Sequence, residues 1–498
     1  MKFYVTTPIY YVNDVPHIGH AYTTWAADIV ARFHRLVGDE VFFLTGTDEH
    51  GAKIAESALK QGKQPQDFVD EVAPKFKETW DRLGISYDRF IRTTDTDHIK
   101  TVGQFLERLN KSGYIYKGEY KGLYCRGCEE FKKPGDLIDG TCPIHNTPAE
   151  EISEPTYFFK LSAFRDQLIE LVRTDQLHVE PRIRKNEVLG FLEGQELEDL
   201  AISRENVAWG IPLPWDTSHT IYVWVDALIN YYTAARDAWW PPTWHLIAKD
   251  ILRFHTVIWP AMLLAIGEEL PKNVFVHGFF TIEGKKISKS LGNVIDPTEL
   301  ADSYGRDAVR FFLFRAFPFG GDGDFSEKLL TEFYNGSLSN ELGNLVQRVG
   351  VMIQKYTGGT VPTVTTRISN VETAIVDDVW RRWEEALQTL DLHEAYIAAW
   401  DLVRFANQRI DEVRPWDLAK TDHDHLNEVL YELAEILRHL SLLLTPLLPD
   451  TAAKIADLLN VSHTESQSRE QFDQQKQWGG LKVGSAVKVG EVLFPRKA

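Results

Sequence analysis

Cysteine is scarce in this chain, with three residues among 498, all of them between positions 125 and 142. Three thiols cannot pair completely, so a disulfide framework is excluded as the source of stability. No run of about 18 apolar residues is present, which excludes a membrane-spanning helix. The N-terminus lacks the basic and small-residue segments of a secretory signal, and we therefore expect a cytoplasmic protein without a membrane partner.

Basic residues are too few to balance the acidic ones, 54 against 72, and the formal net charge is −18. Because phosphate contacts supply much of the affinity for nucleic acids, this deficit excludes nonspecific coating of RNA. It permits RNA binding only through local basic patches on an acidic body. The length predicts roughly two to four domains, and no internal repeat is apparent.

The chain begins with a short buried strand, Met1–Val5, and apolar residues recur at helical spacing between positions 22 and 37. The turn between them carries His17, Gly19 and His20 in a His-x-Gly-His pattern. A strand that leads into a helix through such a turn places backbone N–H groups and side-chain donors where a phosphate would sit. Taken alone, two polar residues that cap a helix are an equally good interpretation.

Strands and helices alternate through the first 112 residues, which predicts one half of a doubly wound, Rossmann-like α/β fold with a parallel sheet. A second strand, Glu40–Leu44, is followed by Asp48, whose carboxylate would lie at the ligand edge of such a sheet. A helix N-cap is the alternative role for Asp48. From about Asn370 onward, apolar residues at three- and four-residue spacing predict an all-α helix bundle.

We therefore expect an α/β domain in two halves, an insertion, a linker region and a helical domain. The predicted bounds are 1–112 for the first half, 113–214 for the insertion, 215–290 for the second half, 291–356 for the linker and 357–498 for the helical domain. A polar, glutamine-rich segment at 462–479 is expected to be a connector.

All three cysteines belong to one motif, in which Cys125 and Cys128 are followed after thirteen residues by Cys142 and His145. Two such knuckles supply four ligands able to close a tetrahedron around zinc. Because four protein ligands leave no open coordination position, we expect one structural Zn²⁺ per chain. Reduced thiols without a metal are the alternative.

A second motif lies far downstream, Lys285-Lys286-Ile287-Ser288-Lys289-Ser290. Together with the His-x-Gly-His turn it resembles the two signature motifs of class I aminoacyl-tRNA synthetases, and most of the chain looks like the bacterial methionyl-tRNA synthetases among them. That family has methionine at the position of Ile287, so one apolar side chain replaces another in this motif. The resemblance implies a ligase that joins L-methionine to ATP, releases pyrophosphate, and transfers the methionyl group to tRNA(Met), initiator and elongator.

The resemblance also implies roles for individual residues. The catalytic residues would be His17, His20, Lys286 and Lys289. ATP would be bound by these four together with Gly19, Asp250 and Ser288, and Mg²⁺ would accompany the nucleotide without a dedicated protein cage. The histidine turn and the lysine loop would close over a single triphosphate and stabilise the charge that grows on it in the transition state.

Methionine, by the same resemblance, would lie in a small aromatic pocket, with Asp48 receiving its ammonium group. The pocket residues would be Pro8, Ile9, Tyr11, Asp48, Trp224, Ala227, Leu228, Tyr231, Ile251 and His255. Each aromatic residue among them is equally a candidate core residue, and Leu228 stands where some members have proline.

The anticodon CAU would be read in the helical domain by Asn344, Arg348 and Trp416, again by resemblance. An amide, a guanidinium and an indole suit hydrogen bonding to base edges and stacking on splayed-out bases. A packing cluster is the alternative for these three residues. Longer members of the family append a separate dimerising domain, and we therefore expect a monomer.

The amino-acid carboxylate is already a nucleophile, so the first step needs positioning and charge stabilisation, and no Ser-His-Asp machinery is apparent. Three rival functions fit the sequence less well. A cysteine-specific synthetase would need zinc with an open position at its pocket. A cytidylyltransferase-like enzyme would have no use for the insertion and the helical domain, and a tRNA-binding adaptor would not need the histidine and lysine pairs.

Overall fold

The computed structural model describes residues 1–13, 15–127, 130–132, 134–205, 207–235, 238–282, 284–286, 294–364, 370–462 and 468–497. The chain divides into two units, which are described separately. The sheet unit comprises residues 3–24 and 42–277, and the helical unit comprises residues 1–2, 25–41 and 278–498. None of the described helices combines the length and apolar character needed to cross a membrane.

A six-stranded sheet forms the centre of the sheet unit, with the strand order β3-β2-β1-β14-β15-β9. The strands are β1 (Lys2–Tyr11), β2 (Glu40–Asp48), β3 (Arg89–Arg92), β9 (His178–Glu180), β14 (Trp244–Ala248) and β15 (Asn273–His277). The pairings β1–β14, β14–β15, β15–β9 and β2–β3 are parallel, as predicted. Because the strand order runs outward in both directions from the β1–β14 pair, the topological switch point lies there.

Five consecutive residues of β1, Phe3 to Thr7, are buried. Successive side chains of a strand point to opposite faces, so both faces of the sheet are covered. Strands β2 and β3 come close at Gly46, where an added Cβ would lie 2.0 Å from the Ile91 carbonyl oxygen. The sheet unit contains the helices α2 (Ala52–Lys60), α3 (Pro65–Arg82), α4 (Thr96–Lys111), α7 (Val223–Leu228), α8 (Asn230–Ala235) and α9 (Trp259–Ile266). Helix α1 (Ile18–Leu36) begins in the sheet unit and continues into the helical unit.

The range predicted to be an insertion contains an antiparallel sheet of order β10-β8-β4-β5. Its strands are β4 (Ile115–Cys125), β5 (Glu130–Lys132), β8 (Glu150–Phe159) and β10 (Leu200–Ala201), and a separate two-stranded ladder joins β6 (Thr141–Cys142) to β7 (Thr147–Pro148). Helices α5 (Arg165–Arg173) and α6 (Arg182–Gly194) follow. Strand β9 lies between these helices in sequence and pairs with β15, so the central sheet takes one strand from this range. A small sheet of β11 (Ser203–Arg204), β13 (Asp216–Ile221) and β12 (Pro212–Leu213) leads back to α7.

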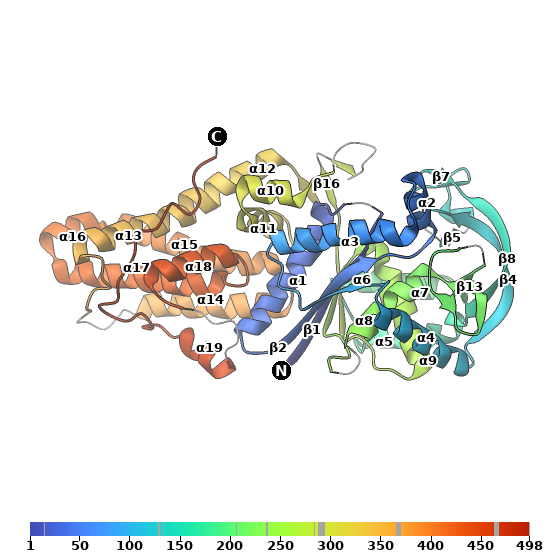
Figure 1. Ribbon diagram of the computed structural model, residues 1–498. Helices are drawn as coiled ribbons and strands as arrows, with labels where there is room; N and C mark the ends of the chain where they lie inside the picture. The colour runs from blue at the N-terminus through green and yellow to red at the C-terminus, as the bar shows by residue number, and fades with distance from the viewer. Residues whose placement is uncertain are drawn as a thin grey trace. The chain divides into compact units, whose positions relative to one another are not determined.

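The helical unit includes a small sheet of order β17-β16-β18, formed by Lys285–Lys286, Phe280–Ile282 and Gly323–Phe325. Its helices are α10 (Pro297–Tyr304), α11 (Arg306–Arg315), α12 (Glu327–Phe333), α13 (Asn344–Thr357), α14 (Asn370–Gln388), α15 (Leu392–Val413), α16 (Pro415–Thr421), α17 (His423–Leu444), α18 (Pro449–Leu459) and α19 (Arg469–Gln475). Helices α13, α15 and α17 run side by side in the bundle (Figure 1).

Helix α17 is the central element of this bundle. The apolar residues at three- and four-residue spacing that predicted a bundle form a buried stripe along this helix, and even its polar residues Glu432, Glu435 and His439 are buried. From Val429 to Leu444 the helix is buried on all sides, so these polar groups must be satisfied internally, because an unpaired buried polar group is costly.

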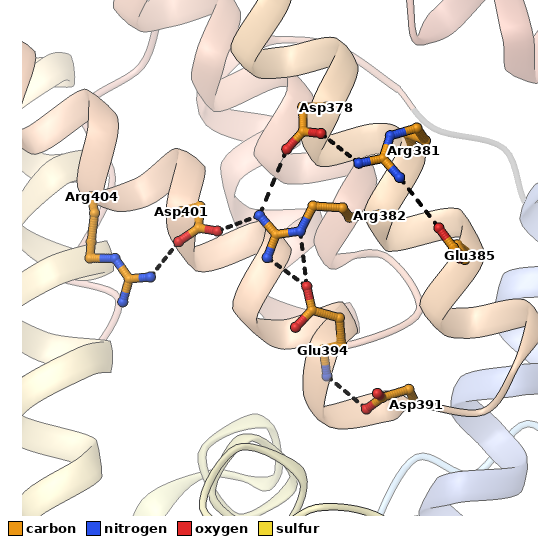
Figure 2. A network of polar contacts seen from close by, with 8 residues as sticks. All are labelled: Asp378, Arg381, Arg382, Glu385, Asp391, Glu394, Asp401 and Arg404. Atoms are coloured by element: carbon orange, nitrogen blue, oxygen red, sulfur yellow. Dashed lines mark hydrogen bonds and ion pairs between the residues drawn. The ribbon is translucent and has the colours of Figure 1, made fainter.

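Ion pairs join α14 to α15 across their antiparallel contact (Figure 2). The guanidinium of Arg382 donates to Glu394 Oε1 through Nε at 2.9 Å and to Asp401 Oδ2 through Nη1 at 2.7 Å. Arg404 pairs with the other oxygen of Asp401. Partly exposed pairs of this kind contribute only about 0–1 kcal/mol each. These ion pairs therefore chiefly fix the register of α14 against α15, because the planar guanidinium group of arginine binds carboxylates in one geometry.

Glu435 attaches the C-terminal segment to α17. Its Oε1 accepts hydrogen bonds from the backbone N–H groups of Gly479 and Gly480, at 2.8 and 2.9 Å, and its Oε2 accepts one from Leu481 at 3.0 Å. Burial alone would raise the pKa of Glu435, but hydrogen bonds from His439 and Arg438 outweigh burial and hold the pKa at about 2. The carboxylate is therefore an anion at neutral pH.

Replacing Glu435→Gln is expected to loosen this attachment. The folded-state pKa lies below the unfolded value, so the stabilisation is fully present above about pH 4.5 and is lost as the pH falls toward 2. A shift of this size corresponds to about 3 kcal/mol at neutral pH. Hydrogen exchange of the 479–481 amides should be much faster in the variant at pH 7, and the difference should shrink on acidification. Equal protection in both proteins at pH 7 would contradict this role.

Candidate active site

The carboxyl ends of β1, β2 and β14 lie at one edge of the parallel sheet, at the switch point. The sequence-predicted residues Tyr11, Asp48 and Asp250 lie at or just after these three ends. Helix α1 begins at Ile18, directly after the β1 loop, so its N-terminus belongs to the same edge. Open α/β sheets bind ligands at such an edge, and a helix N-terminus favours anions.

His17 and His20 are brought together at the first turn of α1. Their rings are stacked with centroids 3.7 Å apart and planes inclined by 20°. The backbone N–H of Gly19 donates to His17 Nδ1 at 3.1 Å, and the backbone N–H of His17 donates to His20 Nδ1 at 3.3 Å. Because each Nδ1 accepts a hydrogen bond, each neutral ring carries its proton on Nε2. The site thus holds two imidazoles in the same tautomer, each with an Nε2–H donor.

Both imidazoles are uncharged at neutral pH. Burial lowers the pKa of His17 to about 4. Burial also lowers the pKa of His20 well below its usual value, and the neighbouring His17 adds to this effect. An anion at this turn would meet neutral N–H donors and the positive end of α1. The space beside Gly19 is filled by the His17 ring, since an added Cβ would lie 3.0 Å from His17 Cε1.

Several of the predicted methionine-binding residues lie close together. Tyr231 on α8 and His255 share a hydrogen bond of 2.7 Å between the phenol oxygen and Nε2. His255 Nδ1 is 3.0 Å from the Ile251 carbonyl oxygen, so Nδ1 carries the proton and Nε2 accepts from Tyr231. Burial raises the pKa of Tyr231, and the nearby charge of Asp48 contributes to the increase. The pair is therefore neutral, with Asp48 as an acidic neighbour.

The other predicted pocket residues lie on β1, on α7 and in the turn after β14. Trp224 stacks on Phe254 with ring centroids 3.9 Å apart. Ala227 and Leu228 are buried on α7 beside Trp224, and Pro8, Ile9 and Tyr11 are half-buried near the end of β1. Asp48 is 6% exposed, whereas Asp250 is exposed to solvent in the turn Lys249–Ile251.

The lysine loop falls mostly outside the described residues. Lys285 and the backbone of Lys286 form β17 in the helical unit, whereas Ile287, Ser288, Lys289 and Ser290 lie beyond the described ranges. The predicted closure of the histidine turn and the lysine loop over one triphosphate stays a prediction.

Sequence reasoning missed several residues at this edge. Tyr10 packs its ring 4.9 Å from that of His20 and joins Thr24 through a 2.7 Å hydroxyl contact. Phe254 stacks on Trp224, as described above. Asp226 is buried between His50 and His98, two histidines far from it in the chain. The position of His50, two residues after Asp48, could have marked it as a residue of this edge. Nothing in the sequence indicated that Asp226 is its hydrogen-bond partner.

The predicted metal ligands are partly assembled in the insertion. Sγ of Cys125, Sγ of Cys142 and a ring nitrogen of His145 all lie within 4.8 Å of one another. Zinc binds thiolate sulfur at about 2.3 Å and imidazole nitrogen at about 2.0 Å, so ligand atoms this close can share one ion. Cys128 lies outside the described residues. Thiolates and an imidazole are a zinc donor set, and the residues present fit that ion.

Gly127 explains how this knuckle closes. A Cβ at Gly127 would lie 2.4 Å from Cγ of the His145 ring and 2.8 Å from its Cβ. Contacts under 3.0 Å require one side to move, so the knuckle backbone and the imidazole can meet only where position 127 carries no side chain.

The predicted anticodon residues lie on two helices of the bundle. Asn344 and Arg348 lie one turn apart on α13, and Trp416 lies in the first turn of α16 with 37% of its surface exposed. Arg348 Nη2 is 2.8 Å from Asp411 Oδ1, near the end of α15 and shortly before α16. This ion pair links α13 to the last turns of α15, just before the segment that carries Trp416.

Two protein-family models together match most of the chain. Residues 3–152 and 132–350 match the family model described as tRNA synthetases class I (M), and residues 361–497 match the anticodon binding domain of methionyl tRNA ligase. The fold with its strand-end site is thus that of a class I tRNA synthetase carrying an anticodon-binding domain.

The chain is also similar over nearly its whole length to individual methionine–tRNA ligases. The chain is 46% identical to the methionine–tRNA ligase of Caldanaerobacter subterraneus subsp. tengcongensis, over 99% of this chain and 78% of that protein. It is 43% identical to the methionine–tRNA ligase of Streptomyces coelicolor, over 99% of this chain and 96% of that protein. Its fold matches Mycobacterium tuberculosis methionyl-tRNA synthetase in complex with methionyl-adenylate with a TM-score of 0.94 and 39% identity, over 99% of this chain and 100% of that one.

The chain belongs to the methionine–tRNA ligase family. The predicted class I fold, the predicted helical anticodon-binding domain and the predicted ligase activity are thereby confirmed. The roles of individual residues, the zinc ion, the domain bounds and the monomeric state stay predictions.

Replacing Gly127→Ala is expected to lower the zinc content of the purified protein, because the new methyl group would overlap the His145 ring. The intact chain should carry about one zinc ion, measured by elemental analysis. Gly135→Ala is the matched control in the same insertion, since an added Cβ there would meet nothing within 4 Å. Equal zinc in both variants would show that the close contact at position 127 does not matter for the metal.

Proposed function

We propose that this chain forms methionyl-adenylate from L-methionine and ATP and then transfers the methionyl group to the 3′ end of tRNA(Met). In the first step a methionine carboxylate oxygen attacks the α-phosphorus and pyrophosphate leaves. In the second, a terminal ribose hydroxyl of the tRNA attacks the carbonyl carbon and AMP leaves. The observation that supports the proposal most directly is the neutral imidazole pair at the α1 N-terminus, on the same strand-end edge as Asp48.

The histidine turn acts on ATP through hydrogen bonds. With Nδ1 of each ring held by a backbone amide, the Nε2–H groups of His17 and His20 are the donors available to phosphate oxygens. Such pre-oriented donors need no reorganisation as charge develops on the phosphate. Lys286, Ser288 and Lys289 would complete the anion site, Asp250 would hold the ribose, and Mg²⁺ would arrive with ATP.

The proposed methionine pocket would bind the ammonium group and the thioether side chain of methionine through different kinds of contact. Asp48 is a buried carboxylate suited to the ammonium group. The Tyr231–His255 pair and the Trp224–Phe254 stack offer neutral, polarisable surface to the thioether. Because His255 is deprotonated at neutral pH, with its pKa lowered by burial to about 4, the pocket presents no positive charge at that end.

Asn344, Arg348 and Trp416 would read the anticodon bases. The exposed pairing of Arg348 with Asp411 is worth at most about 1 kcal/mol, so a base can replace Asp411 as the partner of the guanidinium. Cys125, Cys128, Cys142 and His145 would hold a structural zinc that fixes the insertion. A monomeric state and a cytoplasmic location remain predictions from the sequence.

The activity test is exchange of labelled pyrophosphate into ATP, measured with each of the twenty amino acids. Methionine alone should support exchange. Exchange with a different amino acid would overturn the specificity, and a lack of exchange would favour a tRNA-binding adaptor. As the matched variants, His20→Asn retains an acceptor near the Nδ1 position but loses the Nε2–H donor, whereas His20→Gln keeps a donor near Nε2. We expect the exchange rate to fall about 10²-fold in the first and much less in the second.

Replacing Trp416→Ala is expected to weaken tRNA recognition without touching adenylate formation. Stacking of a base on an aromatic side chain is worth about 1–3 kcal/mol, so kcat/KM for tRNA(Met) should fall roughly 10- to 100-fold. Pyrophosphate exchange should be unchanged, and Trp416→Phe should retain most of the tRNA activity. A parallel loss of exchange would assign Trp416 to packing instead.

A further inference from the structure

Asp226 is a buried carboxylate with two histidine partners. Its Oδ2 is 2.7 Å from His50 Nδ1, and its Oδ1 is 2.8 Å from His98 Nε2. The three side chains come from three separate segments: the loop after β2, the first turn of α4 and the short helix α7. All three residues are at most 5% exposed, so water does not compete for these hydrogen bonds. We name this group the Asp226 clamp.

The clamp has a defined charge state. Burial by itself would raise the pKa of Asp226, but the two histidines outweigh burial and hold the pKa at about 2. The carboxylate is therefore an anion that accepts one N–H from each ring. On its other side, His98 Nδ1 is 3.0 Å from Thr233 Oγ1 on α8. The clamp thus fixes α4, α7 and α8 and the loop after β2 to one another through polar contacts of fixed direction.

The clamp connects the two ends of the proposed methionine site. His50 lies two residues after Asp48, which would receive the ammonium group. Asp226 lies two residues after Trp224 and directly before Ala227, which would contact the side chain. The His50 segment is also held by Trp209, whose Nε1–H donates to the Glu49 carbonyl at 2.6 Å and whose carbonyl accepts from the Gly51 N–H at 3.1 Å.

We propose that Asp226, with His50 and His98, is a positioning residue that sets the separation between Asp48 and α7, and thereby selects the length of the amino-acid side chain. The inference rests on the proposed function and deepens it. The ammonium is held at one end and the thioether at the other, so a change in this separation favours a shorter or a longer homologue. Homocysteine lacks the terminal methyl group and ethionine adds a methylene, and one methylene is worth only about 10- to 200-fold in such pockets.

The test compares methionine, homocysteine and ethionine in pyrophosphate exchange. Asp226→Asn keeps the shape but offers one acceptor oxygen and one NH₂ group, so one histidine loses its acceptor. We expect the methionine KM to rise about tenfold while the ATP KM changes less than twofold. The preference of the variant for methionine over homocysteine or ethionine should fall at least threefold.

Matched variants of His50 and His98 distinguish loss of the N–H donors to Asp226 from a general loss of stability. An asparagine amide occupies roughly the place of Nδ1, so His50→Asn keeps the donor and His50→Leu removes it. A glutamine amide reaches roughly the place of Nε2, so His98→Gln keeps the donor and His98→Leu removes it. The donor-keeping variants should retain most of the selectivity, and the leucine variants should lose it. If Asp226→Asn does not fold, these variants test the clamp by themselves.

Asp307→Asn is the control for loss of a buried carboxylate elsewhere. Asp307 lies in the helical unit and accepts from the N–H and hydroxyl groups of Thr451, both at 2.7 Å. This variant should lower the Tm without changing the selectivity ratios. Selectivity that stays at the wild-type value in the clamp variants, with only the Tm reduced, would overturn the clamp as a positioning device. A wild-type protein without methionine-dependent exchange would instead overturn the proposed function.

Discussion

The pairing of β1 with β14 is the constraint on which the rest of the sheet unit depends. Val5 lies opposite Trp244 and Thr6 opposite His245, and the Thr6 hydroxyl and His245 Nδ1 are 2.6 Å apart in the core. Because the chain adds strands outward on both sides of this pair, loops that leave β1 and β14 separate to opposite faces of the sheet. The histidine turn, the Asp48 carboxylate and the hydrogen-bonded Tyr231–His255 pair follow the ends of these strands and of their neighbour β2.

Burial, rather than a concentration of charge, tunes the described part of this site. His17, His20 and His255 are all neutral because desolvation lowers their pKa values. Their hydrogen-bond partners then decide which ring nitrogen donates. A chain with a net charge of −18 can thereby offer a polyanionic substrate oriented N–H donors and a helix N-terminus. Asp226, whose pKa the two histidines hold at about 2, is a buried anion, and Asp48 is buried at the same edge.

Much of the architecture was predictable from local pattern. The strand–helix alternation predicted the parallel sheet, the three- and four-residue spacing predicted the buried stripe of α17, and the cysteine spacing predicted a knuckle in which Cys125, Cys142 and His145 now lie within 4.8 Å of one another. Strand β9 was not predicted to join the central sheet, because three residues inside a long insertion carry too little pattern to indicate a partner almost a hundred residues away.

The sequence by itself determined what depends on neighbours along the chain: helical faces, buried strands, the knuckle spacing and the two signature motifs that carried the family resemblance. Only the tertiary structure decided which buried donors and acceptors form hydrogen bonds with one another. Asp226 meets partners 176 and 128 residues away, and the Glu435 carboxylate is satisfied by amides more than forty residues downstream. Ionisation and tautomer depend on burial and on the direction of hydrogen bonds, and both exist only after distant segments have packed.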